Sequence, residues 1–296
     1  MIRGKTDKIF EGVCIALAVL LAVLCLYPLL YTFGVSICSE AEWTDRNGIL
    51  VLFPTKPSFV AYQKIFGVGS YVVKALWMSL LRTLAGTLTA VAVNALVGYV
   101  LSREYFPGKQ AYIYLLLFTI FFSGGLIPNY LVIKELNLLN NFWSMILPNI
   151  VGAWNILIFK QFFMGLPKEI EEAATIDGIS ELGLFLKIVL PLSTPVVASI
   201  GLFTMVGHWN NWFDVMIYID QAHSELWTLQ YYIMINFNNL SQIDSSKVEI
   251  GIGGGVTQLT QRMALTIVGF VPILCIYPFF QRFFKDGVYL GAVKGK

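Results

Sequence analysis

The charged residues of this chain that could do chemistry are concentrated in one short insert, residues 165–191. It lies between two segments apolar enough to span a bilayer, and its first half carries the carboxylates Glu169, Glu171, Glu172 and Asp177, followed by Gly178. Pro167 suits the first turn of a helix, and carboxylates near that turn lie at the positive end of the helix dipole. Gly178 ends the predicted helix because glycine permits a positive φ. Nothing in this pattern looks catalytic, so we expect a projecting helix that binds a soluble partner.

The rest of the insert predicts a small apolar face and a second helix. Three residues give the first helix a surface able to lie flat against another protein: Ala173, Ala174 and Ile176. Ser180 can cap a second helix, 181–190, that Pro191 closes. The simpler interpretation is an ordinary amphipathic loop between two membrane spans.

A second set of polar and aromatic residues lies within apolar segments, where polar groups are costly and therefore mark candidate sites. The candidates for a solute path are Asn94, Tyr99, Trp154, Asn155, Trp209, Asn210 and Asn211. Aromatic faces stack on sugar rings and amides bond to hydroxyls, so such a lining would suit a sugar bound at low affinity. Asn210 is favoured among its neighbours. The alternative for each residue is polar glue between packed helices.

Two titratable residues of the same segments are left open. Arg82 extends its charge to the membrane edge, pairs with Asp214, or attracts an anionic sugar, and the sequence does not choose among these roles. For His208 we favour packing between helices over a role in the solute path.

The composition is that of a membrane protein. Hydrophobic residues make up 57% of the chain and charged residues 13%, against about 45–50% and about 25% in ordinary soluble domains. The net charge of +2 is too small to indicate nucleic-acid binding. The four cysteines show neither a disulfide framework nor a zinc motif, and the glycine cluster 251–255 lacks the lysine of a phosphate-binding loop. We therefore expect no metal and no cofactor in this chain.

Six segments are long and apolar enough to cross a membrane as helices, which need about 20 residues. They are 10–37, 72–101, 111–133, 142–164, 192–219 and 264–284. The first exceeds the about 7–15 apolar residues of a signal peptide, so we interpret it as a retained anchor. Lys and Arg are denser on one side, which predicts that both termini are cytoplasmic. The expected parts are an anchor and outer segment 1–71, a membrane domain 72–284 with the insert, and a tail 285–296.

The insert and several motifs outside it carry a family resemblance. The insert reads Glu-Ala-Ala, three further residues and Gly, then an apolar stretch ending Leu-Pro. The motifs outside it are Tyr62 with Ile65-Phe66, Ser102-Arg103 before Phe106-Pro107-Gly108, Ile127-Pro128, Trp209-Asn210, Tyr277 to Phe283 and Gly291 to Gly295. From Ala61 to Lys296 their order resembles the carbohydrate-uptake class of ABC importer permeases. The chain is similar in particular to the smaller maltose permease and to the lipoprotein/oligosaccharide permeases of Gram-positive bacteria.

This resemblance implies an all-α fold, a type I ABC importer permease with about six transmembrane helices and a cytoplasmic coupling helix. It implies that an ATPase subunit contacts Glu171, Glu172, Ala173, Ala174, Asp177, Gly178, Ala292, Val293, Lys294 and Gly295. The chain has no Walker A sequence, so it would be a transport subunit rather than an enzyme, with ATP and magnesium bound by partner ATPase subunits. Two ATPase subunits, a second homologous permease, an extracytoplasmic solute-binding protein, an oligosaccharide and lipid are the implied partners. The implied location is the bacterial cytoplasmic (inner) membrane.

Other functional classes remain as alternatives. An ABC permease for polyamine or phosphate would share the coupling loop, but the C-terminal Gly-Ala-Val-Lys-Gly speaks against it. An ion-coupled secondary transporter would want a buried carboxylate near mid-membrane, whereas the carboxylates here lie near the ends of spans. A membrane enzyme would need a catalytic set, which two well-separated histidines do not supply.

Overall fold

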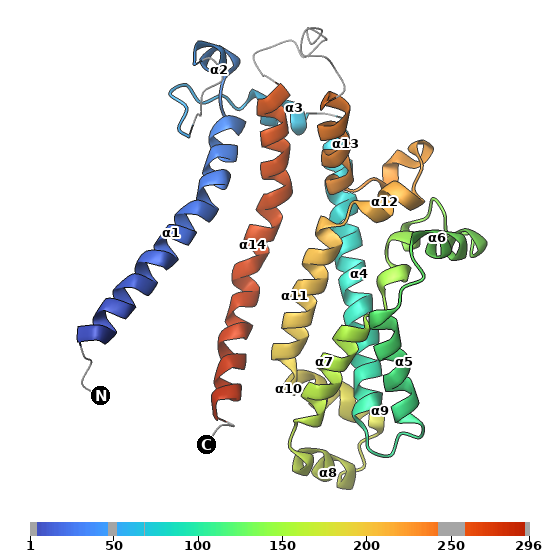
Figure 1. Ribbon diagram of the computed structural model, residues 1–296. Coiled ribbons are helices and arrows are strands. Elements are labelled where there is room, and N and C mark those ends of the chain that lie inside the picture. The colour runs from blue at the N-terminus through green and yellow to red at the C-terminus, as the bar shows by residue number, and fades with distance from the viewer. Residues whose placement is uncertain (1–4, 47–51, 68, 242–257, 294–296) are drawn as a thin grey trace. The chain divides into compact units, whose positions relative to one another are not determined.

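The computed structural model describes residues 5–46, 52–67, 69–241 and 258–293, and within these ranges the protein is helical. The described residues contain no strand, only an isolated antiparallel bridge between Cys38 and Pro57. The all-α prediction is confirmed. Figure 1 shows the helices in chain order.

Two compact units make up the chain, and each is described by itself. Unit 1 comprises Met1–Val73 and Ile233–Val271, and unit 2 comprises Lys74–Tyr232 and Pro272–Lys296. The helices that begin in unit 1 are α1 (Lys5–Ser36), α2 (Glu40–Asp45), α3 (Val60–Ile65), α4 (Tyr71–Ser102) and α14 (Gln258–Val293). Those that begin in unit 2 are α5 (Lys109–Phe121), α6 (Leu126–Glu135), η1 (Phe142–Met145), η2 (Leu147–Asn149), α7 (Ala153–Met164), α8 (Lys168–Ile176), α9 (Glu181–Leu184), η3 (Phe185–Val189), α10 (Leu190–Leu192), α11 (Thr194–Asn210), α12 (Phe213–Tyr218), η4 (Gln221–Leu226) and α13 (Leu229–Ser241).

Three described helices are each long and apolar enough to cross a membrane without a break. They are Ile9–Ser36 of α1, α4, and Gln258–Phe279 of α14. Three further spans form only if two helices joined by a bend are counted together, which raises the total among the described residues to as many as six. About six transmembrane helices were predicted, and the family's fold bears this out.

The three bent spans correct the boundaries expected from hydropathy. Segment 111–133 is α5 and α6, bent by 117° at Gly125, whose φ is +86°. Segment 142–164 bends by 54° before α7, at Gly152, whose backbone is extended. Segment 192–219 is not one span, because the helix from Glu181 bends by 81° at Ser193 and α11 ends at Asn210. Glycines and prolines at these places interrupt helical hydrogen bonding, which a hydropathy pattern does not detect.

Helix α4 is unbroken although several polar residues fall within it. Five of these polar side chains are buried inside the protein: Ser79, Arg82, Thr83, Thr87 and Asn94. Small residues let other helices approach this face closely. A Cβ at Gly98 would lie 2.6 Å from Cβ of Phe159 on α7. The polar residues therefore mark the packed side of α4.

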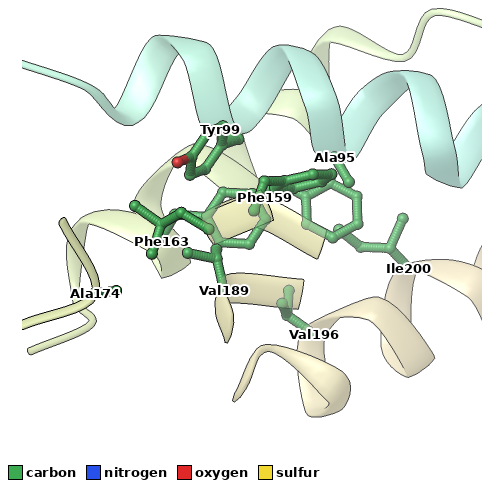
Figure 2. Packing of buried hydrophobic residues seen from close by; sticks show 10 residues of the cluster. Ala95, Tyr99, Phe159, Phe163, Ala174, Val189, Val196 and Ile200 are labelled. Atoms are coloured by element: carbon green, nitrogen blue, oxygen red, sulfur yellow. The ribbon is translucent and has the colours of Figure 1, made fainter. Parts of the chain in front are cut away.

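An aromatic and aliphatic core joins the short helices α8 to α10 to the long helices of unit 2. Its buried members are Ala95, Tyr99, Phe159, Phe163, Ala174, Leu184, Phe185, Val189, Val196 and Ile200. Figure 2 shows the rings of Phe159 and Phe163 lying beneath Tyr99 of α4. The Tyr99 and Phe185 ring centroids are 4.8 Å apart. Because Ala174 of α8 is one of its members, this core packs α8 against the long helices of unit 2.

Candidate functional site

Helix α8 is the charged helix that the insert predicts. It runs from Lys168 to Ile176, with Pro167 directly before it and Glu169 and Glu171 in its first turn. Asp177 follows it, and Gly178 then takes a φ of +75°, a conformation that a side chain with a Cβ rarely adopts. Figure 1 shows α8 at one end of unit 2, at the opposite end from α6 and α12. The sequence predicted both the helix and its glycine stop.

The second helix of the insert begins as predicted but ends later. The Ser180 hydroxyl accepts a hydrogen bond from the Gly183 N–H at 3.2 Å, so Ser180 is the N-cap. The helical segment then continues through the π-helical turn η3 and through Pro191 to Leu192. Pro191 does not close the helix, because α10 includes it and ends one residue later, at Leu192. The chain turns at Ser193 instead.

Arg103, the residue after α4, holds the insert in place. Its Nη1 donates to a carboxylate oxygen of Glu171 on α8, and its Nη2 donates to the Tyr99 hydroxyl. The guanidinium also lies over the Tyr99 ring, 4.2 Å from its centroid. Glu181 of α9 is 3.7 Å from Arg103 and accepts a 3.0 Å hydrogen bond from the Tyr99 hydroxyl. One arginine at the end of α4 thus contacts both helices of the insert.

Two weaker contacts flank Arg103. Lys168 pairs with Glu104 at 2.7 Å, and this hydrogen bond and charge lower the pKa of Glu104. Both side chains are mostly exposed, so the pair contributes little to stability. The Tyr105 hydroxyl donates to Glu181 at 2.8 Å. Sequence reasoning placed Arg103 in a family motif but gave it no role, because a contact to residues 171 and 181 has no signal in local spacing.

The predicted coupling residues divide between an inner and an outer face of α8. Glu171 is half-buried on Arg103, and Ala174 is buried in the core of Figure 2. The remainder of the set on the insert is exposed: Glu172, Ala173, Asp177 and Gly178. Ile176 is 85% exposed, so an apolar side chain stands among these charges. Lys294 and Gly295 lie outside the described residues, as do the side chains of Ala292 and Val293.

A groove of about 720 Å³ runs beside α8. It is lined by the end of α4, by the end of α7 and by one side of α8, with Arg103, Glu104 and Lys168 among its polar side chains. Leu184 and Phe163 form part of its apolar wall. The insert therefore has an exposed face and a recess next to it.

At the other end of unit 2, Arg82 pairs with Asp214. The Nη2–Oδ2 distance is 2.5 Å, and the Arg82 side chain is 0% exposed. Arg82 also donates to the carbonyl oxygens of Asn211 at 2.7 Å and Met145 at 3.1 Å. The Asn211 amide donates to the same Asp214 oxygen at 2.7 Å. Of the three roles left open for Arg82, the structure has the pair with Asp214.

Two pockets meet at Asn149, next to this ion pair. The first, about 320 Å³, is lined by Asn149, Asn155, Phe203, Thr204, Gly207, His208 and Asn211. The second, about 290 Å³, is lined by Ser123, Gly125, Leu126, Asn129, Pro148, Asn149, Phe213, Asp214, Ile217 and Tyr218. The structure thus brings together two of the predicted path residues, Asn155 and Asn211. Sequence reasoning missed Asn149, which follows Pro148 in an apolar stretch with no pattern to single it out.

The other predicted path residues lie elsewhere. Trp154 and Asn210 are exposed outside these two pockets, and Trp209 is buried. Tyr99 belongs to the core beneath α8. For these four residues a place in the solute path stays a prediction.

The side chain of Asn94 forms hydrogen bonds with backbone groups at the break before α7. Its amide nitrogen donates to the carbonyl oxygens of Ala90 at 2.7 Å and Ile150 at 3.1 Å, and its Oδ1 accepts from the Gly152 N–H at 2.9 Å. Such hydrogen bonds join packed segments to one another, which is the alternative role that the sequence left open for Asn94. His208 packs closely against α4, since a Cβ at Gly86 would lie 2.6 Å from its ring, and it also lines the 320 Å³ pocket.

Comparison with known proteins finds relatives among transport system permeases. The chain is 36% identical, over 98% of its length and 99% of the relative's, to the polygalacturonan/rhamnogalacturonan transport system permease protein YtcP of Bacillus subtilis (strain 168). It is 33% identical to the LplC protein of the same organism, over 100% of this chain and 98% of that one. No family model matches the chain.

A solved structure has the same fold. A chain of a bacterial ABC transporter involved in the import of the acidic polysaccharide alginate superposes with a TM-score of 0.87 at 26% identity, covering 96% of this chain and 99% of that one. The protein belongs to the sugar ABC importer permeases. It is therefore a membrane permease subunit of such an importer.

Proposed function

We propose that α8 couples this permease to ATP hydrolysis by partner ATPase subunits, which hold the ATP and magnesium. The observation that supports the proposal is that α8 has one face packed against the protein and one face exposed. Arg103 and the core hold its inner face, while Glu172, Ile176 and Asp177 are left exposed. This exposed face of α8 is available to a partner protein. The C-terminal residues Ala292 to Gly295 would add a second contact.

The assembly we propose has two different, homologous permeases, two ATPase subunits and an extracytoplasmic binding protein that delivers the sugar. It would lie in the bacterial inner membrane with both termini cytoplasmic. In this chain the anchor and outer segment would be 1–71, the permease domain 72–284 and the cytoplasmic tail 285–296. The density of Lys and Arg on the side of α8 supports this orientation.

For the solute path we propose the two pockets that share Asn149. Their linings combine amides, hydroxyls and a carboxylate with the rings of Phe203, Phe213 and Tyr218. Hydroxyl-rich, ring-shaped solutes need this mixture of hydrogen-bonding groups and apolar faces. Because Asp214 already pairs with Arg82, this wall presents neutral polar groups rather than a free positive charge next to Asn149.

The test is ATP-driven uptake by the complete complex in proteoliposomes with its binding protein. Galacturonan, rhamnogalacturonan and alginate oligosaccharides form the acidic arm of the panel, since relatives handle such polymers, and maltotetraose serves as a neutral comparator. We expect accumulation of at least one oligosaccharide that requires both ATP and the binding protein. Accumulation driven by a proton or sodium gradient without ATP would contradict the proposal.

A further inference from the structure

Helix α4 carries one arginine inside its span, and a second arginine follows directly after it. Arg82 lies in its first half and Arg103 directly follows its last residue, Ser102. The 21 positions from 82 to 103 correspond to about 32 Å along a helix axis, roughly the thickness of the hydrocarbon core. The three bent spans around it are interrupted, whereas α4 is not. A continuous helix transmits displacement along its axis better than a broken one does.

The side chain of Arg103 is bound to the insert. Arg103 contacts Glu171 of α8 and Glu181 of α9, and it is largely buried, at 13% side-chain exposure. A guanidinium bound to carboxylates in partial burial holds its partners more rigidly than an exposed lysine would. The neighbouring Lys168–Glu104 pair, exposed on both sides, lacks this property.

Arg82 contacts residues that line the two proposed solute pockets. Arg82 bonds the carbonyl oxygens of Met145, before one break, and Asn211, after the end of α11. Its ion-pair partner Asp214 lines one pocket, and Asn211 lines the other. A displacement of α4 would therefore move groups of both pockets.

Contacts between the two arginines leave α4 little freedom to slide alone. Asn94 bonds the backbone at Ile150 and Gly152, and Gly98 packs against Phe159 with no room for a methyl group. Close-packed interfaces shift between discrete arrangements rather than deform continuously.

We infer that α4 is the rod that carries the movement of α8 to the solute pockets, with Arg103 as the positioning residue that joins the rod to α8. The inference rests on the proposed coupling of α8 to ATP hydrolysis. An ATPase subunit that displaces α8 would pull Arg103 through Glu171, and α4 would pass the displacement to Arg82 and the backbone it holds. Loss of the Arg103 contact should separate ATP hydrolysis from transport.

The first experiment measures this separation in the complete complex, as sugar transported per ATP hydrolysed. Glu171→Gln removes the charge that binds Arg103 from α8, and Arg103→Gln removes the arginine. Lys168→Gln is the matched control, since it breaks an ion pair of the same helix that is exposed. We expect the two Arg103-contact variants to lower the transport-to-hydrolysis ratio at least about fivefold, the lower end of typical coupling between linked sites. Galacturonan trimer and maltotetraose are the probes.

The second experiment needs no sugar. Spin labels at Leu96→Cys on α4 and Glu169→Cys on α8, both exposed positions, are placed in a chain whose four native cysteines are replaced by alanine. We expect their distance to be the same in the nucleotide-free complex and in the complex trapped with ATP and vanadate. With Glu171→Gln added, we expect the distance to change or broaden on trapping.

The outcomes separate this inference from the proposed coupling. If Gly178→Val leaves transport intact, the coupling role of α8 is wrong and the inference fails with it. If Gly178→Val abolishes transport but both Arg103-contact variants keep the native ratio and a fixed label distance, only the rod is wrong. If the complex with Arg103→Gln does not assemble, Glu171→Gln and the charge exchange Arg103→Glu with Glu171→Arg test the inference instead. Recovery of the transport-to-hydrolysis ratio in the exchanged pair supports it.

Discussion

Arg82 and Asp214, 132 positions apart in the sequence, form an ion pair inside the permease, and the two carbonyl oxygens that Arg82 also contacts lie at the end of η1 and directly after α11. The arginine thus provides hydrogen bonds to two backbone carbonyls where helices end. In a membrane such groups have no water to bind, so the pair supports backbone geometry as well as charge balance.

Removal of one partner of this pair should destabilise the protein. Asp214→Ala leaves a buried guanidinium without its counter-charge, a loss of about 3–5 kcal/mol in comparable buried pairs. We expect a clear drop in the melting temperature and yield of the purified complex. The double variant Arg82→Met, Asp214→Leu should recover part of this loss, because it leaves no uncompensated charge. Equal melting of Asp214→Ala and the native protein would show that the pair is dispensable.

Gly178→Val and Glu172→Lys should abolish transport while the protein stays in the membrane. At a φ of +75° a β-branched residue is strained, so the valine variant distorts the turn after α8, and the lysine reverses a charge on the exposed face. Uptake and membrane content are measured in parallel. Gly12→Val, on an exposed face of α1 with open space around it, is the control for glycine replacement. Native uptake by both α8 variants would remove α8 from the coupling mechanism.

Single cysteines should report the orientation. Thr175 on α8 and Thr44 on α2 are both exposed, and the orientation we propose puts the first inside the cell and the second outside. In a cysteine-free background, a membrane-impermeant maleimide should label Thr44→Cys in intact cells and Thr175→Cys only after the cells are opened. The reverse pattern would invert the topology.

Asn155 and Asn94 should respond differently to alanine. Asn155 lines a solute pocket, so Asn155→Ala should raise the sugar concentration for half-maximal uptake about fivefold, equivalent to one hydrogen bond of ~1 kcal/mol. Asn94→Ala leaves the break at Gly152 without its partner and should lower the melting temperature instead. Melting and uptake curves on the same preparations distinguish the two. Loss of stability with unchanged half-saturation in Asn155→Ala would assign it to packing.

A pH-dependent contact lies outside the spans, between His223 and Asp220. The hydrogen bond between them raises the pKa of His223 and lowers the pKa of Asp220. The histidine's contribution is complete below its ordinary pKa of 6.5 and is lost as pH rises through the raised value, and the aspartate's is lost only as pH falls through the lowered one. Rate-corrected hydrogen exchange of residues 218–226 should therefore be slower at pH 5 than at pH 8. His223→Gln should remove this difference, and a difference that survives in the variant would point to another group.

The sequence was sufficient for features that rest on local chemistry. The charged helix between Pro167 and Gly178 follows from a capping pattern, and the N-cap at Ser180 follows from the same rules. The number of spans follows from hydropathy, and the family resemblance from motif order.

Features that rest on contacts between distant residues were not predictable. The breaks at Gly152 and Ser193 depend on which backbone groups find partners elsewhere, as Gly152 does on Asn94. The joint at Arg103 and the meeting of two pockets at Asn149 depend on helix packing. Arg82 shows the limit most clearly, because three roles fitted its sequence position and only the fold chose among them.

Helix α1 is longer than the hydrocarbon core that it is expected to cross. Its apolar stretch Ile9–Ser36 has 28 residues, or about 42 Å of helix, against a hydrocarbon core of about 30 Å. The excess is accommodated by tilting the helix or by thickening the bilayer around it. Lipids with longer acyl chains would relieve that mismatch and shorter ones would increase it. The lipid composition chosen for reconstitution therefore acts on the protein through its first helix.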